Sequence, residues 1–212
     1  ASVQPAQLAE IKQPWRWYHR EELGQLNFPK ANHSMIQKLQ WPQRIKISED
    51  LNILSNLDTD QMLYWRVDLT SERIMQLAQC PVDQLSKLIV NKQFWSHLNE
   101  LQQQTIRTIH LKQTQLMELK QGDLKSGYRY LAACHDLSAL IHAEQIGCEA
   151  ALLSPVLATE THPDTPALGW ERFKQMAEQV QIPVFALGGL RTEDLHDAKR
   201  QHAYGIAGIR YV

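Results

Sequence analysis

From residue 130 onward the chain alternates short apolar runs with stretches of helical periodicity, and this alternation constrains the fold most strongly. The apolar runs lie at 130–134, 149–156, 182–187 and 204–212. The helical patterns lie between them, at 136–147, 170–180 and 193–202. Short, almost continuously apolar strands separated by helices are typical of a parallel sheet covered on both faces. Four such units predict half of a (β/α)8 barrel, and a doubly wound open sheet is the alternative.

The preceding part of the chain is less regular but also contains four strand-like runs. These runs lie at 43–48, 62–69, 87–91 and 105–111, with predicted helices at 71–79 and 94–103. The connector 49–61 is too short for a regular helix with two loops, so we expect a reduced helix there. Eight strands together predict an α/β fold, a compact (β/α)8 TIM barrel. Its helices should be reduced, because the barrel would be shorter than the ~250 residues typical of this fold.

Residues 1–42 do not follow the barrel pattern. They contain a predicted aromatic strand at 14–18, an acidic turn, and a predicted helix at 30–39 that Trp41 and Pro42 close. We therefore predict two parts: a short strand-helix segment over 1–42, acting as a cap or a remnant of another domain, and a barrel over 43–212.

Composition excludes several function classes. The formal net charge of −1 gives no electrostatic reason to bind nucleic acid or an anionic membrane. No apolar run approaches the ~20 residues that a membrane span needs, and the first residues lack the order of a signal peptide. Cys80, Cys134 and Cys148 form no CxxC pair and indicate a reducing, cytoplasmic environment. The nine histidines show no tight metal-ligand spacing, so no metal ligand is predicted from motifs.

Gly188 and Gly189 end the apolar run 182–187 just before a predicted helix start. Glycine accepts a positive φ angle and lets the backbone approach a ligand closely. A helix N-terminus beside it offers free N–H groups to an anion. This sequence therefore predicts either a phosphate-binding turn or a tight βα turn that binds nothing.

Three ordered segments of the C-terminal half resemble the thiamine phosphate synthase/TenI family. They are "SPVLATETHPDTPALGWERF", "IPVFALGGL" and "GIAGIR". The resemblance is close over residues 130–212 and weaker over 43–129. Residues 1–42, with "REEL" and "FPKAN", resemble the C-terminal end of a Nudix (MutT-type) domain. The Nudix box is not in this sequence, so the resemblance implies a Nudix domain as partner and no Nudix activity here.

The resemblance implies a binding site for a small phosphorylated ligand. Enzymes of the family join a pyrimidine pyrophosphate to a thiazole phosphate. Their phosphate site corresponds to Gly188 and Gly189 together with the end of the last strand, and Arg210 stands where the family usually has serine. Loop threonines contact the thiazole side, and His162 replaces the lysine that usually follows them. The expected phosphate and substrate residues are Thr159, Thr161, His162, Gly188, Gly189, Gly208, Ile209 and Arg210.

On the pyrophosphate side the sequence departs from the family pattern. Arg66 matches, but Lys92 follows Asn91 where the family has a metal-binding aspartate, and Gln115 replaces a second one. The family thus implies Mg²⁺, whereas these replacements argue against it. The candidate catalytic residues are Arg66, Asn91 and His135. His110, within a predicted strand, is expected to be a packed core histidine.

Three functions stay open at this point. The first is a thiamine phosphate synthase or TenI-like enzyme of thiamine biosynthesis that binds a phosphorylated thiazole-type ligand. The second is a catalytically impaired ligand-binding or regulatory module of a Nudix hydrolase fusion. The third is a structural or dimerising appendage, with a homodimer as the expected assembly.

Overall fold

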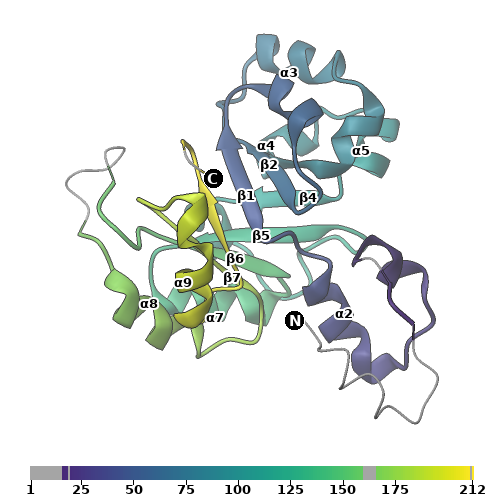
Figure 1. Cartoon of the computed structure of the whole chain (residues 1–212). Helices are drawn as coiled ribbons and strands as arrows, with labels where there is room; N and C mark the ends of the chain where they lie inside the picture. The colour runs from purple at the N-terminus through teal and green to yellow at the C-terminus, as the bar shows by residue number, and fades with distance from the viewer. Residues whose placement is uncertain (1–15, 19, 160–165, 211) are drawn as a thin grey trace. The chain divides into compact units, whose positions relative to one another are not determined.

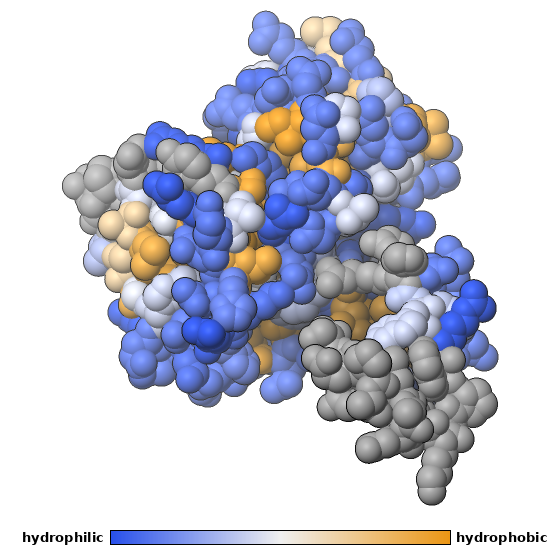
Figure 2. All heavy atoms as spheres, viewed as in Figure 1, coloured by the Kyte–Doolittle hydropathy of each residue, from blue (hydrophilic) through white to orange (hydrophobic). Residues whose placement is uncertain are grey.

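A computed structural model describes residues 16–18, 20–159, 166–210 and 212. The chain divides into two compact units, Ala1–Trp41 and Pro42–Val212. Hydrophilic residues cover most of the face shown in Figure 2, with smaller hydrophobic groups between them. Within the described ranges, no helix is both long and apolar enough to cross a membrane.

The second unit is a closed barrel of eight parallel strands, which confirms the predicted fold class (Figure 1). Each strand pairs with its neighbour in sequence, and β8 closes the barrel on β1 with Arg44 beside Ile206. The strands are β1 (Arg44–Ser48), β2 (Gln61–Trp65), β3 (Leu88–Asn91), β4 (Thr108–Leu111), β5 (Arg129–Cys134), β6 (Ala150–Leu153), β7 (Val184–Leu187) and β8 (Gly205–Gly208). Every predicted strand of the barrel is present.

Short helices connect the strands, as the length of the barrel predicted. The α-helices are α3 (Ser71–Ala78), α4 (Lys92–Trp95), α5 (Glu100–Thr105), α6 (Gln113–Met117), α7 (Leu137–Ile146), α8 (Gly169–Ala177) and α9 (Leu195–Arg200). The 3-10 helices are η3 (Leu51–Asn56), η4 (Val82–Lys87) and η5 (Thr192–Asp194). The connector between β1 and β2 contains only η3, which agrees with the reduced helix expected there.

The single helix predicted over 94–103 is wrong. The structure has two helices in this region, α4 and α5, separated by four residues without helical structure. Asn99 is the physical reason, because its side chain accepts a hydrogen bond from the Gln102 N–H and the Gln102 side chain accepts one from the Asn99 N–H. Such a capping box begins a new helix rather than continuing an old one.

The first unit contains η1 (Arg20–Gln25), η2 (Lys30–Asn32) and α2 (His33–Leu39). The helix predicted at 30–39 is therefore present as a 3-10 turn that leads into an α-helix. Of the strand predicted at 14–18, only Arg16–Tyr18 are described, and these three residues belong to no strand.

Phe185 of β7 fills the barrel interior beside the start of β8. Its side chain is fully buried, and its ring lies 5.4 Å from that of Tyr204 in an edge-on contact. Gly205 makes room for it, because a Cβ atom there would lie 2.9 Å from Phe185 Cε1. The small residue on β8 and the large one on β7 are thus complementary.

We predict that Phe185→Ala lowers the free energy of unfolding by about 3–5 kcal/mol, since it removes a large buried ring and leaves a cavity. Met75→Ala is the control, because Met75 is 58% exposed and such surface changes cost under about 0.5 kcal/mol. Urea denaturation measures both. Equal losses for the two variants would contradict the packing described here.

Candidate functional site

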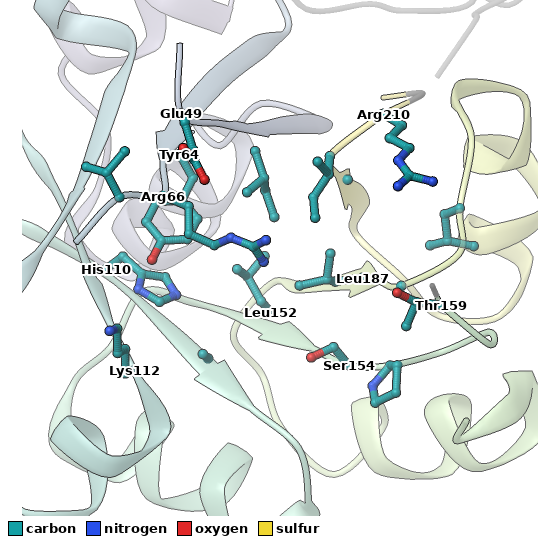
Figure 3. A pocket seen from close by; sticks show the side chains of 18 of the residues that line it. Glu49, Tyr64, Arg66, His110, Lys112, Leu152, Ser154, Thr159, Leu187 and Arg210 are labelled. Carbon is teal, nitrogen blue, oxygen red and sulfur yellow. The ribbon is translucent and has the colours of Figure 1, made fainter. Parts of the chain in front are cut away.

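A cavity of about 1130 Å³ opens at the carboxyl ends of the barrel strands (Figure 3). In a barrel of parallel strands all carboxyl ends meet at one face, where the loops that follow them surround one mouth. Five Lys or Arg side chains and three Asp or Glu side chains are among the described residues that line it: Arg66, Arg73, Lys112, Arg191, Arg210, Glu49, Asp68 and Glu72. The excess of positive charge suits an anionic ligand.

Gly188 and Gly189 form the turn after β7, and both have the positive φ angles expected of them, 111° and 69°. A Cβ atom at Gly188 would lie 2.9 Å from Pro155 Cα, and one at Gly189 would lie 2.6 Å from the Ala158 carbonyl oxygen. The backbone that approaches the glycine pair is therefore the chain's own β6–α8 loop. Leu157 N–H donates to the Gly188 carbonyl at 3.1 Å and holds that loop in place.

The N–H groups of this turn are available to a ligand. Gly188, Gly189 and Ile209 line the cavity, and their N–H groups donate no hydrogen bond to any residue in the described ranges. The next helix start contributes less than the sequence suggested, because the Arg191 N–H already donates to Asp194 Oδ2 at 2.8 Å. Among the described residues, the glycine-turn amides are therefore donors open to a ligand, whereas the Arg191 N–H is already engaged.

Of the other residues expected around this phosphate site, some line the cavity and some lie outside the described residues. Thr159, Gly208 and Arg210 line the cavity with the glycines. Figure 3 shows the Arg210 guanidinium directed towards the cavity from the end of β8. Thr161 and His162 lie outside the described residues.

The opposite side of the cavity is formed by the ends of β2 and β4. Arg66 follows β2, and its guanidinium points towards the middle of the cavity in Figure 3. The side chain is exposed and forms no ion pair or hydrogen bond with the described residues. Below it, the rings of Tyr64 and His110 are stacked with centroids 4.1 Å apart.

Asn91 lies behind this stack and is 2% exposed, so it positions other groups rather than lining the cavity. Its side-chain nitrogen donates to Gln115 Oε1, and Gln115 Nε2 donates back to Asn91 Oδ1, both at 3.3 Å. The same nitrogen lies 3.5 Å from His110 Nδ1. The structure thus pairs Asn91 and Gln115 as two neutral amides.

His135 lies at the end of β5 and lines the cavity. Its Nδ1 lies 3.0 Å from the Ser154 carbonyl oxygen and 3.3 Å from Ser154 Oγ. Its backbone N–H donates to Gln113 Oε1 at 2.7 Å. His135 is therefore held between Gln113, at the start of α6, and Ser154, directly after β6.

Several lining residues were not among the predicted site residues, and Tyr64, Lys112 and Ser154 are polar examples. Strand alternation could have found the first two, because residues two apart in a strand face the same side. Tyr64 precedes Arg66 by two, and Lys112 follows His110 by two. His110 is buried as expected, at 4% exposure, but it also lines the cavity.

Burial keeps the ring stack neutral. It lowers the pKa of His110 to about 3, with the charges of Lys112 and Arg66 lowering it further. Burial also raises the pKa of Tyr64 to about 12. Both rings therefore stay uncharged across the physiological range.

The residues in the family's metal-binding positions do not fit Mg²⁺. This ion is held in proteins mainly through carboxylate oxygens, whereas Lys92 is a cation and Gln115 offers an amide, as does Asn91 beside it. Both amide oxygens already accept backbone hydrogen bonds, from Gln93 N–H at 3.1 Å and from Lys112 N–H at 2.9 Å. No group of three or more His, Cys, Asp or Glu side chains in the described part of the chain is placed to hold a metal ion.

Comparison with known proteins agrees with this architecture. The family model described as thiamine monophosphate synthase matches residues 71–212. A putative thiamine-phosphate synthase 2 of Aquifex aeolicus is 39% identical over 77 residues, which are 36% of this chain and 41% of that protein. A thiamine-phosphate synthase of Chloroflexus aurantiacus is 32% identical over 81 residues, 38% of each protein.

Among solved structures, a thiamine phosphate pyrophosphorylase from Pyrococcus furiosus has a TM-score of 0.59 at 14% identity, over 82% of this chain and 87% of that one. At that identity the likeness shows the fold. The matches to the curated relatives span about two fifths of their length. The family match begins at residue 71, so the Nudix resemblance of residues 1–42 stays a prediction.

We predict that the free energy of unfolding falls as the pH drops from about 6.5 towards 3. In that window the unfolded chain protonates His110 at its ordinary pKa of about 6.5, whereas the folded protein keeps it neutral. The stabilisation is therefore complete above pH 6.5 and lost below.

Urea titrations at several pH values test this, with His110→Gln expected to flatten the slope. His196→Gln is the matched control, since its side chain is 74% exposed. A slope that His110→Gln leaves as steep as in the wild type would refute the assignment.

Proposed function

The chain belongs to the thiamine monophosphate synthase family, and on that premise we propose that its barrel binds a phosphorylated thiazole-type molecule of thiamine biosynthesis. The observation that carries the proposal is the set of free N–H donors of Gly188, Gly189 and Ile209 at one rim of the cavity. Arg210 adds a guanidinium at the same rim, a geometry suited to phosphate. Backbone donors that need no rearrangement on binding give a rigid anion site.

A second candidate, binding without turnover, is favoured by the neutral Asn91–Gln115 pair. Pyrophosphate departure develops negative charge, which synthases stabilise with cationic groups and a metal. Two amides whose oxygens are already engaged provide little of that stabilisation. The protein would then sense or hold the ligand, as a regulatory module does.

We predict that Gly189→Val abolishes phosphate binding, because a side chain there collides with the loop at Leu157 and Ala158. Gly122→Val is the matched control: Gly122 also has a positive φ, 96°, but has open space around it. Arg210→Gln, at an exposed position, should weaken binding about tenfold or more, as expected for a charged hydrogen bond. Calorimetric titration with inorganic phosphate and a thiazole phosphate measures all three. Undiminished binding in Arg210→Gln and Gly189→Val would rule out this rim.

The choice between turnover and binding alone is tested with both phosphorylated substrates. We expect the purified chain to bind the thiazole phosphate yet release no pyrophosphate, with or without Mg²⁺. Mg²⁺-dependent pyrophosphate release, measured by a phosphatase-coupled assay, would instead establish synthase activity and overturn the second candidate.

A further inference from the structure

Residues 155–157, which follow β6, are hydrogen-bonded along the end of β7. Val156 N–H donates to the Leu187 carbonyl at 2.9 Å, and Leu157 N–H donates to the Gly188 carbonyl at 3.1 Å. These two bonds continue the contact between β6 and β7 beyond the paired strand residues. The position of the glycine turn after β7 therefore depends on where residues 155–157 lie.

The same residues are held from the other side by the start of α8. Leu168 N–H donates to the Pro155 carbonyl at 2.8 Å, and Gly169 N–H donates to the Val156 carbonyl at 2.9 Å. Val156 thus uses its N–H on β7 and its carbonyl on α8, so it joins the two elements directly. Leu168, the N-cap of α8, makes no side-chain cap hydrogen bond, and the two backbone bonds attach the helix start to residues 155–157.

Gly169 has a backbone conformation that helix formation does not require. Its φ is 71°, whereas a residue of an α-helix normally has a φ of about −60°. A Cβ atom built on Gly169 would meet no atom within 4 Å, so lack of space does not explain a glycine at this position. The positive φ does explain it, because residues with a side chain rarely adopt that conformation.

We infer that Gly169 is a positioning residue for the glycine turn, acting through the hydrogen bond from its N–H to the Val156 carbonyl. Gly169 itself lies outside the lining of the cavity. The inference deepens the proposed function and rests on it, because the turn carries the N–H donors proposed to bind phosphate.

The physical reason is the direction of the Gly169 N–H. With a negative φ at position 169, this N–H would turn away from Val156, and residues 155–157 would lose one of their two bonds to α8. The glycine turn would then spend less time in its binding conformation. The apparent affinity for a ligand falls by the same fraction as the population of the binding conformation.

Calorimetric titration of the full chain with inorganic phosphate tests this inference. Gly169→Val should weaken binding about fivefold or more, because a β-branched residue opposes a positive φ. Gly169→Asn should stay within about twofold of the wild type, because asparagine tolerates this conformation. If Gly169→Val does not fold, Gly169→Ala gives the same comparison with about threefold weakening.

Gly147→Val is the matched control. Gly147 also has a positive φ, 97°, with open space around it, and its N–H also donates to a carbonyl, that of Glu144. It ends α7 and precedes the amino end of β6, far from the mouth. Gly147→Val should therefore change phosphate affinity by less than about twofold, as expected for distant sites.

Amide hydrogen exchange tests the positioning role without any ligand. In Gly169→Val, the Val156 and Leu157 amides should exchange about fivefold or more faster relative to the Leu152 amide within β6, because the opening is local. In Gly147→Val this ratio should stay as in the wild type. The ratio thus separates a local effect on residues 155–157 from a general loss of stability.

The two ideas can fail separately. A wild-type chain that binds no phosphate but shows this exchange pattern would refute the proposed function and support the positioning role. Wild-type phosphate affinity in Gly169→Val, equal weakening in Gly169→Val and Gly147→Val, or an unchanged exchange ratio in Gly169→Val would overturn the inference.

Discussion

The pairing of β8 with β1 is the constraint on which the rest of the structure depends. Ile206 N–H donates to the Gln43 carbonyl at 2.9 Å, and the closed sheet has no free edge. Closure also brings the last loop of the barrel to the first strands, where Lys46 Nζ donates to the Arg210 carbonyl at 3.4 Å. An open sheet would leave these two ends of the barrel unit on opposite edges, and the cavity would lose its shared mouth.

Within that mouth, neutral groups organise the side formed by the ends of β2 and β4, here called the β2–β4 rim. Burying a charge without a partner costs far more than burying a hydrogen-bonded amide. Asn91 and Gln115 satisfy each other, and each also accepts a backbone N–H at the start of a helix. The adjacent imidazole of His110 is buried as well, and burial lowers its pKa, so it too stays uncharged. Arg66 and Lys112 form no ion pair with a residue that the structure describes. They lie at the exposed ends of the strands, where water reduces the cost of their charge.

Much of the barrel could be predicted from sequence because its strands are short apolar runs with helices between them. The turn at Gly188 and Gly189 was also predictable, since two adjacent glycines at a strand end indicate positive φ angles. The break between α4 and α5 was not, because helical periodicity continues through 94–103 and the cap at Asn99 depends on local geometry. The surroundings of His110 could not be predicted either. The pairing of β3 with β4 sets Asn91 beside His110, and Asn91 also exchanges hydrogen bonds with Gln115. These contacts depend on the register of the two strands, which the sequence pattern does not determine.

The glycine rim, formed by Gly188, Gly189 and Ile209, differs from the β2–β4 rim in the kind of hydrogen-bond donor it presents. This difference explains why substitutions affect the two rims differently. At the glycine rim the donors are backbone N–H groups, which every residue except proline supplies, so Arg210 in place of the family's usual serine leaves them intact. At the β2–β4 rim the donors are side chains, so each substitution alters the chemistry. Lys92 and Gln115 stand where the family resemblance implies acidic residues, so neither position supplies a carboxylate here. Side chains at the strand ends can therefore change the chemistry of the mouth without changing the fold.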